Sequence, residues 1–299
     1  MKKVFLFLSL FIIVALACDV SVNMVPTSQA PMTTNTTSPA VEPATTTPEI
    51  FISLTQAMPA TVVPQPVEVS VDPLSVVLSP AVANGARGEQ FPRADGTDLP
   101  YFELTPGHTT LTLEGYLLQD KFHEPRIYVY PALDYAQLVP AAFESMHRLR
   151  NIMNPGTPIS AEQLPAVPFF NAAQVFASNI QSISFQNGDG VRFLTEYAQY
   201  AAPVNNHDLF YQFQGFSADG EYYIIAIFPI TAPVLAETGE AGAAVPAGGI
   251  ALPDINDPNA DWAGYYSAVT NLLDGTSPES FTPTLQQLDE LIQSIQIAQ

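Results

Sequence analysis

The sequence predicts an α+β domain in which an antiparallel sheet packs against helices. Three observations lead to this prediction. Four apolar runs separated by turn residues within residues 174–230 are typical of a four-stranded antiparallel meander. Apolar residues at steps of three and four predict a helix before the meander and another at the C-terminal end of the sequence. Hydrophobic residues make up 47% of the chain, which is enough to form a buried core.

Three strands and one helix are expected before the meander. Alternation of apolar and polar residues predicts strands over residues 74–80, 109–118 and 125–132. An apolar stripe at steps of three and four predicts a helix over residues 134–153. Pro140 is compatible with this helix only in its first turn, because proline has no N–H to donate further along.

Turn chemistry defines the meander. Asn187 and Gly188 suit a tight hairpin, because both residues tolerate positive φ. The polar loop APVNNHD (202–208) separates the second run from the third, and SADGE separates the third from the fourth. The last run, YYIIAIFPI (222–230), is apolar on both faces, so we expect it to lie centrally or under a helix.

The C-terminal part is expected to contain a long loop over residues 232–258 and two helices. The first helix is predicted over residues 260–274 and the second over residues 282–297. Thr282 is the expected N-cap of the second helix, with Pro283 at its first helical position. This helix closes the predicted sheet on one side.

The order of strands, helix, meander and closing helix resembles the extracytoplasmic α+β sandwiches related to PsbP and Mog1. The closing segment LQQLDELIQSIQI contributes most to this resemblance, which implies an α+β sandwich. The stretch from GVRFLTEYAQ to GEYY is similar to bacterial lipoproteins without an assigned function. That second resemblance implies no particular activity.

The N-terminal residues have the layout of an export signal. MKK is followed by 14 predominantly apolar residues and then by Cys18, the single cysteine of the chain. A run this short does not span a bilayer, and we predict a signal peptide over residues 1–17. VALAC resembles the lipobox of bacterial lipoprotein precursors, although Leu16 lies at position −2 instead of the usual −3. The resemblance implies acylation of Cys18, and an ordinary signal-peptidase site is the alternative.

The composition of residues 25–66 predicts a tether. These 42 positions contain ten Thr, three Ser and eight Pro, with no Gly, Lys or Arg. Such a segment buries little apolar surface, so we expect residues 18–66 to be disordered and residues 67–299 to form a single domain. The tether would hold this domain away from a membrane surface.

The charge of the chain limits its partners. There are 29 acidic and nine basic residues, for a formal net charge of −20. An acidic surface repels phosphate, which excludes nucleic acid and anionic lipid headgroups. A cationic or neutral partner is favoured, such as an envelope protein, a peptide or a glycan.

The sequence contains no recognisable catalytic or cofactor-binding motif. The four histidines are too dispersed for a zinc site, and the single Glu144-x-x-His147 motif is typical of a solvated helix face. Ser217 lies in GFSADG, where Asp219 replaces the second glycine of a nucleophile elbow, so a hairpin turn is the better interpretation. We therefore predict no catalytic residue and no cofactor. The histidines are His108, His123, His147 and His207.

The segment DINDPNAD (254–261) concentrates oxygen ligands of the kind that calcium prefers. Its spacing fits no EF-hand, and we favour an acidic loop without a metal. Asp254, Asp257 and Asp261 are the calcium candidates of this loop.

Scarce cations and clustered aromatic residues offer further candidates. Arg126 and Arg192 fall in predicted strands, where each either anchors an anionic ligand or, as we favour, pairs with a carboxylate across strands. Four aromatic residues of the last two runs either pack against a helix, the commoner arrangement, or line a groove for a glycan or peptide. These are Tyr211, Phe213, Tyr222 and Tyr223.

Together these observations predict a lipid-anchored membrane lipoprotein that faces the periplasm or the cell exterior and acts as a binding or assembly module. An exported hydrolase-type enzyme with dispersed carboxylates and a structural envelope protein are the alternatives. Carboxylates converging in a cleft would favour the enzyme, and an apolar groove rimmed by polar groups would favour the binder. Loops 202–208 and 254–261 are the expected contacts, because binding residues concentrate on loops held by a rigid scaffold.

Overall fold

The central element of the fold is a large antiparallel sheet. The computed structural model describes residues 65–154 and 156–298, so the predicted signal peptide, Cys18 and the predicted tether up to residue 64 lie outside the described residues. The strands of the large sheet are β3 (Gly85–Phe91), β4 (His108–Glu114), β5 (Arg126–Pro131), β6 (Ala173–Phe185), β7 (Gly188–Ala198), β8 (Phe210–Ser217) and β9 (Tyr222–Pro229). A small sheet consists of β1 (Val67–Val71), β2 (Leu74–Leu78) and β10 (Gln296–Ile297). The helices are α1 (Ala132–Leu138), α2 (Pro140–Ile152), α3 (Trp262–Asp274) and α4 (Leu285–Gln293).

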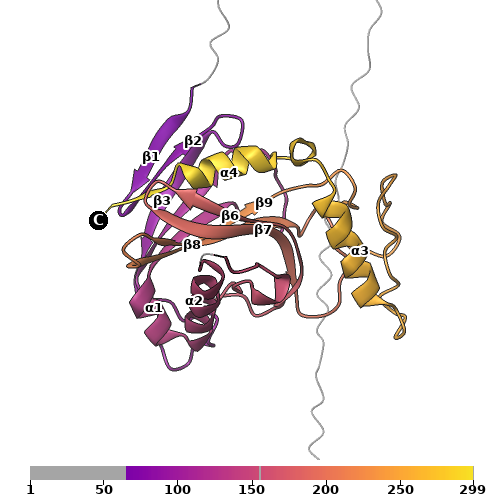
Figure 1. Cartoon of the computed structure of the whole chain (residues 1–299), viewed down its shortest axis with the longest axis horizontal. Coiled ribbons are helices and arrows are strands. Elements are labelled where there is room, and N and C mark those ends of the chain that lie inside the picture. The colour runs from indigo at the N-terminus through magenta and orange to yellow at the C-terminus, as the bar shows by residue number, and fades with distance from the viewer. Residues whose placement is uncertain (1–64, 155, 299) are drawn as a thin grey trace, which may run out of the picture. The chain divides into compact units, whose positions relative to one another are not determined.

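The large sheet has the order β3-β4-β5-β9-β8-β7-β6, and all of its neighbouring strands are antiparallel. Helices α1 and α2 cover one face, and α4 lies over the other face with the small sheet beside it (Figure 1). The α+β class predicted from the sequence is confirmed. Strand β9 lies between β5 and β8 and is buried on both faces, as its apolar sequence predicts.

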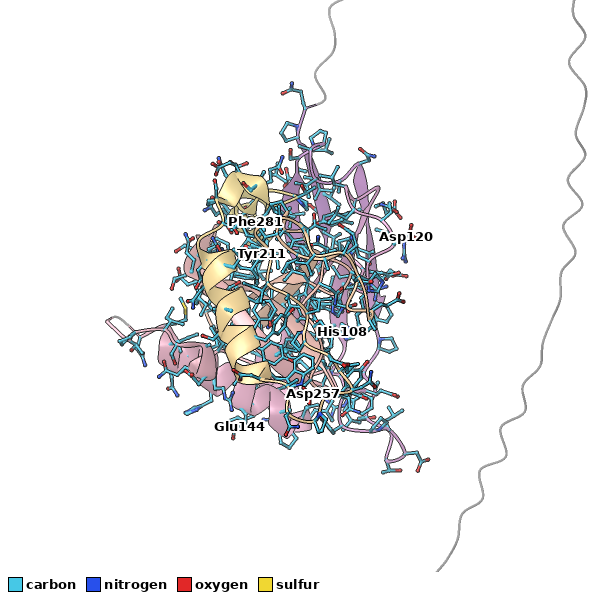
Figure 2. The ribbon with its side chains drawn as sticks, turned by 90° about the vertical axis from the view of Figure 1, so that its right-hand side faces the viewer. His108, Asp120, Glu144, Tyr211, Asp257 and Phe281 are labelled. Carbon is cyan, nitrogen blue, oxygen red and sulfur yellow. The ribbon has the colours of Figure 1, made fainter. Side chains whose placement is uncertain are left out.

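Each face of the sheet has its own hydrophobic core, because side chains alternate between the two faces of a strand. Figure 2 shows Tyr211 and Phe281 inside the molecule, while Asp120 lies at its edge. Tyr211 is fully buried and Phe281 is 2% exposed, and both belong to the core on the α4 side. Helix α3 adds its own buried side chains to the same core. None of the helices in the described part of the chain has the length and hydrophobicity that a membrane-spanning helix requires.

The single helix predicted over residues 134–153 is wrong, because the structure has two helices there. Helix α1 ends at Leu138, and Pro140 occupies the first turn of α2 as the sequence predicts. The N–H of Val139 still reaches the carbonyl of Tyr135 at 3.0 Å, but Pro140 has no N–H to continue the series. The proline therefore ends one helix and begins the next.

The predicted start of the C-terminal helix is also wrong. Helix α4 begins at Leu285, with Thr284 rather than Thr282 as its N-cap. The Thr284 hydroxyl accepts the N–H of Gln287 at 3.2 Å, and Oε1 of Gln287 accepts the N–H of Thr284 at 2.9 Å. This reciprocal capping box satisfies two backbone donors and sets the helix start, which leaves Pro283 outside the helix.

Candidate functional site

A pocket opens at one end of the large sheet, beside the end of β7. We call it the aromatic pocket, and its volume is about 420 Å³, a size typical of small-molecule sites. It is lined by the β3–β4, β4–β5 and β7–β8 loops, the segment before β6, and the end of β7. Antiparallel pairing brings these last segments together, because the end of β7 lies beside the starts of β6 and β8.

Aromatic rings form much of the wall of this pocket. Phe170 has a central place, since its ring centroid lies 5.2 Å from that of His123 and 5.1 Å from that of Tyr197. Phe122 and Tyr200 are 66% and 70% exposed. Large aromatic side chains left in water beside a pocket are typical of an interaction site. The aromatic lining residues are Phe102, Phe122, Phe169, Phe170, Tyr197 and Tyr200.

Glu196, near the end of β7, is a buried carboxyl group in this wall. It is 2% exposed, and its Oε2 accepts the N–H of Asn205 at 3.3 Å. Its Oε1 has no hydrogen-bond partner among the described residues. Burial raises the pKa of Glu196 to about 9, and the nearby Asp208 carboxylate adds to the rise. At neutral pH, Glu196 therefore carries a proton and is a neutral hydrogen-bond donor.

Asp208 is the second carboxyl group of the pocket. Its Oδ2 accepts Nδ2 of Asn205 at 2.9 Å, and its Oδ1 lies 2.6 Å from Nδ1 of His207. His123 also lines the pocket, with its ring centroid 4.4 Å from that of Phe210. Burial lowers the pKa of His123 to about 4, although Asp208 opposes this change. The imidazole of His123 is therefore neutral near pH 7.

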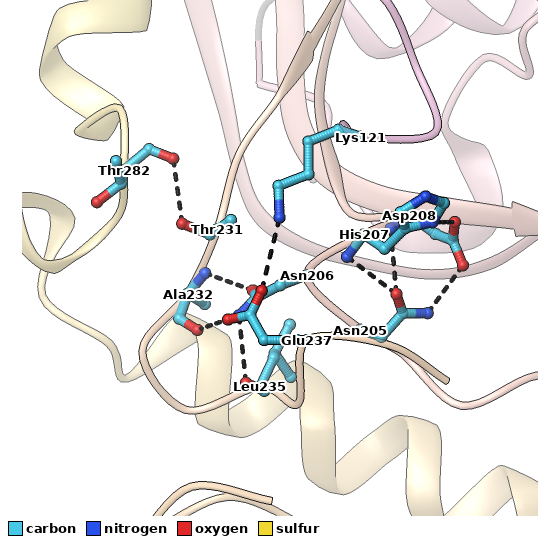
Figure 3. A network of polar contacts seen from close by, with 10 residues as sticks. All are labelled: Lys121, Asn205, Asn206, His207, Asp208, Thr231, Ala232, Leu235, Glu237 and Thr282. Carbon is cyan, nitrogen blue, oxygen red and sulfur yellow. Dashed lines mark hydrogen bonds and ion pairs between the residues drawn. The ribbon is translucent and has the colours of Figure 1, made fainter. Parts of the chain in front are cut away.

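The β7–β8 loop that presents Asp208 is held by buried polar contacts (Figure 3). Asn206 is 3% exposed and donates from Nδ2 to the carbonyl oxygens of Ala232 at 3.1 Å and Leu235 at 3.2 Å. Its Oδ1 accepts the N–H of Ala232 at 2.8 Å. These bonds fasten the loop to the segment after β9. Most polar side chains of the predicted contact loop thus stabilise the loop itself, and Asp208 is the one that lines the aromatic pocket.

Helix α3 also makes hydrogen bonds to this loop. The Tyr265 hydroxyl accepts the N–H of Val204 at 3.0 Å, and the Tyr266 hydroxyl accepts the N–H of Ala202 at 3.0 Å. The Tyr266 hydroxyl also donates to the carbonyl of Ala202. Hydrogen bonds to α3 and to the segment after β9 therefore hold the loop at Ala202, Val204 and Asn206.

The three calcium candidates lie around a hollow beside α3. Oδ1 of Asp254, Asp257 and Asp261 each accepts a backbone N–H two or three residues further along the chain, at 2.9 Å in every case. Asp261 is the N-cap of α3. Within residues 65–154 and 156–298, no group of three His, Cys, Asp or Glu side chains is arranged to hold a metal ion.

The two strand arginines do not make the cross-strand ion pairs that the sequence predicts. Arg192 is 5% exposed and pairs with Asp289 of α4 at 3.1 Å, because its side chain faces that helix. Arg126 pairs with Glu124 in the loop before β5.

Tyr211, Phe213 and Tyr223 are fully buried in the cores, so they pack inside the fold, as the sequence favours, and do not line a groove. The remaining member of that group, Tyr222, is partly buried against the core on the α4 side. Ser217 donates to Oδ1 of Asp219 at 2.5 Å within the β8–β9 hairpin, as the turn interpretation predicts.

Glu196 and the aromatic pair Phe169 and Phe170 belong to no motif that identifies them as pocket residues in the sequence. The signal for Glu196 is an acidic residue inside the apolar run VRFLTEYA, where an unpaired charge is unexpected. For the phenylalanines, the signal is a pair of large apolar residues in a loop segment.

Comparisons of the chain with protein-family models, with curated proteins and with solved structures find no match in any of the three.

Proposed function

We propose that this chain is an extracytoplasmic binding module that holds a small organic ligand in the aromatic pocket, and that a lipid on Cys18 anchors it to a membrane. The observation on which the proposal rests is a pocket of about 420 Å³ that combines aromatic walls with two carboxyl groups. Small-molecule sites typically have this combination of apolar walls and few, well-placed polar groups. The fastened β7–β8 loop also supports binding, because a preformed site loses little conformational entropy when a ligand enters.

Binding fits the carboxyl groups better than catalysis does. A general acid works best when its pKa lies near the working pH, and the pKa of Glu196, about 9, is well above neutrality. Both oxygens of Asp208 already have partners in the loop. One observation favours a hydrolase-type enzyme as a second candidate: Asn205 contacts both Glu196 and Asp208, so the two carboxyl groups converge on one residue.

Ligand-observed NMR tests the binding site directly. The full chain carrying Cys18→Ser is mixed with panels of amines, amino acids, sugars and aromatic acids, and saturation transfer is recorded. Ala172 lines the pocket, and Ala172→Trp should fill it and abolish transfer to any ligand that binds there. Ala218→Trp, in the turn between β8 and β9 at the opposite end of the sheet, is the matched control.

We expect at least one class to bind the parent chain and the control equally and to lose binding to Ala172→Trp. Equal binding, or no binding, in all three proteins would overturn the pocket as the site. If signals of a reaction product appear with time and are absent with Asp208→Asn, the chain is an enzyme and the binding-module proposal is wrong.

The membrane anchor has a separate test. We expect the parent chain to fractionate with membranes and the Cys18→Ser variant to fractionate as a soluble protein, because two or more acyl chains give stable anchoring. Incorporation of labelled palmitate into the parent chain alone would support the lipid. Membrane retention of the Cys18→Ser variant would refute it.

A further inference from the structure

The charge of the aromatic pocket narrows the class of ligand. Its described lining residues include Glu196 and Asp208 but neither lysine nor arginine. Lys121 is next to the lining residue Phe122 in the chain, yet it does not line the pocket, and its Nζ lies 3.6 Å from Oε2 of Glu237. A ligand with a carboxylate or phosphate would find no opposite charge there, whereas a cation would find Asp208.

The rings of the pocket favour a cation with apolar substituents. An aromatic ring has a negative face that attracts an ammonium group, and the attraction is strongest where water is excluded. Six phenylalanine and tyrosine rings line this pocket, and Tyr197 packs closely against Phe170 within it. Alkyl groups on the ammonium would cover the same rings by apolar contact. A small hydrated metal ion would gain neither benefit.

We infer that the aromatic pocket binds an organic cation of the alkylammonium class, with the aromatic rings around its alkyl groups and the Asp208 carboxylate near its charge. This inference rests on the proposed function and names the ligand class of the same site. It also assigns a role to the buried Glu196, whose Oε1 has no partner among the described residues.

Glu196 couples cation binding to release of a proton. When a cation enters beside the neutral carboxyl, the O–H bond of Glu196 breaks, the proton passes to the buffer, and the carboxylate that remains balances the ligand charge. The groups facing Glu196 are Asp208 from the loop and Tyr265 and Tyr266 from α3. Burial raises the pKa of Tyr265 to about 12 and raises that of Tyr266, so both hydroxyls stay neutral when Glu196 titrates.

The test compares choline with 3,3-dimethylbutan-1-ol, which has the same shape and no charge. N-acetylglucosamine is the uncharged sugar probe, and isothermal titration uses the full chain carrying Cys18→Ser. Choline should bind at least roughly tenfold more tightly than the neutral isostere, because of the ring faces and Asp208. Ala172→Trp should abolish this binding, and Ala218→Trp should preserve it.

The pH dependence gives a second, independent readout. Choline has a fixed charge, so any change in its affinity between about pH 7 and pH 9.5 reports on the protein. If choline lowers the pKa of Glu196 by about one unit, its affinity should rise roughly tenfold over this range. Glu196→Gln should make the affinity for choline independent of pH. Asp208→Asn should lower the affinity for choline and leave the affinity for the neutral isostere unchanged.

The outcomes separate the two proposals. Two outcomes would overturn the inference of a cationic ligand and keep the proposed binding module: equal affinities for choline and its isostere, or binding of N-acetylglucosamine alone. In both cases the binding must be lost in Ala172→Trp. Binding that Ala172→Trp does not affect, or no binding of any probe together with a negative NMR panel, would overturn both.

Discussion

The loops at residues 202–208 and 254–261 have similar compositions and opposite environments. Both are rich in Asn and Asp, and the sequence predicts both as contact loops. In the first, Asn205 and Asn206 are 1% and 3% exposed and bond to surrounding groups. In the second, almost every residue is exposed, and the carboxylates bond only to their own turns.

The difference shows that burial, more than residue type, gives a polar loop its role. A buried amide must find partners, because an unsatisfied one costs about 1–3 kcal/mol, so Asn206 determines how the loop folds. The folded loop in turn covers Glu196 and removes its water, which favours the neutral carboxyl. The exposed loop has no such effect on its neighbours.

The largest expected effect is a pH-dependent gain in stability on Glu196→Gln. The folded-state pKa of about 9 lies above the ordinary value of 4.5, so folding favours the protonated form. The stabilisation from that proton is complete below about pH 4.5 and is lost as the pH rises towards 9. From about pH 6 to pH 8, the free energy of unfolding of the variant should therefore rise by at most about 3 kcal/mol relative to the parent.

Urea unfolding of both proteins across this pH range measures the difference. If the difference in free energy of unfolding between the two proteins does not change with pH, Glu196 is ionised in the folded protein. The claim that loop 202–208 keeps this carboxyl group neutral would then be wrong.

Asn206→Ala and Asn256→Ala compare the two loops directly. Asn206→Ala leaves the N–H of Ala232 and the carbonyl of Leu235 without their buried partner, so it should reduce the free energy of unfolding by about 2 kcal/mol. Asn256 is exposed, and its replacement should change stability by less than about 0.5 kcal/mol. Thermal or urea unfolding measures both changes. Similar losses of stability in the two variants would contradict the difference between the buried and the exposed loop.

Asp261 is the exception within the exposed loop, because it caps α3. Its Oδ1 accepts the N–H of Gly264 at 2.9 Å, and Asp261→Ala should reduce stability by about 1 kcal/mol. Asp254→Ala, which removes a turn contact and no helix cap, is the matched control and should cost less. Equal losses would show that capping contributes little here.

The smallest expected effect is that of calcium on loop 254–261. We expect millimolar calcium chloride to change the melting temperature by less than about 1 °C, because the three carboxylates already cap local turns. A larger rise that disappears in Asp257→Asn would place calcium at Asp254, Asp257 and Asp261. Differential scanning fluorimetry with a chelator control measures this.

Local chemistry made much of the fold predictable. The β6–β7 hairpin lies where the sequence predicts it, but its turn residues are Gln186 and Asn187, because Gly188 already pairs with Phe185, and neither Asn187 nor Gly188 has positive φ. The apolar run of β9 indicates a central strand. The sequence does not predict strand β3, because its residues are exposed or half-buried and show no apolar alternation. A Cβ on Gly88 would lie 2.5 Å from that of Val71, so this glycine permits a close approach of β1 that only tertiary structure reveals.

The candidate site was less predictable than the fold. Asp208 lies in a loop predicted to bind, since Asn and Asp in a polar segment indicate a surface loop. Glu196 and Phe170 lie 26 residues apart in different elements, and strand pairing alone brings them to one pocket. No local sequence pattern shows that loop 202–208 covers Glu196, and it is this burial that raises the pKa of the carboxyl group.

The central claim, that the aromatic pocket holds a neutral buried carboxyl group ready for a ligand, is tested most directly by titrating Glu196. Carbon-13 NMR of the glutamate side-chain carboxyls, assigned by the signal missing in Glu196→Gln, follows this group through the pH range. We predict a midpoint near pH 9 that falls when choline is added. A midpoint near the ordinary value of 4.5, unchanged by choline, would contradict the account.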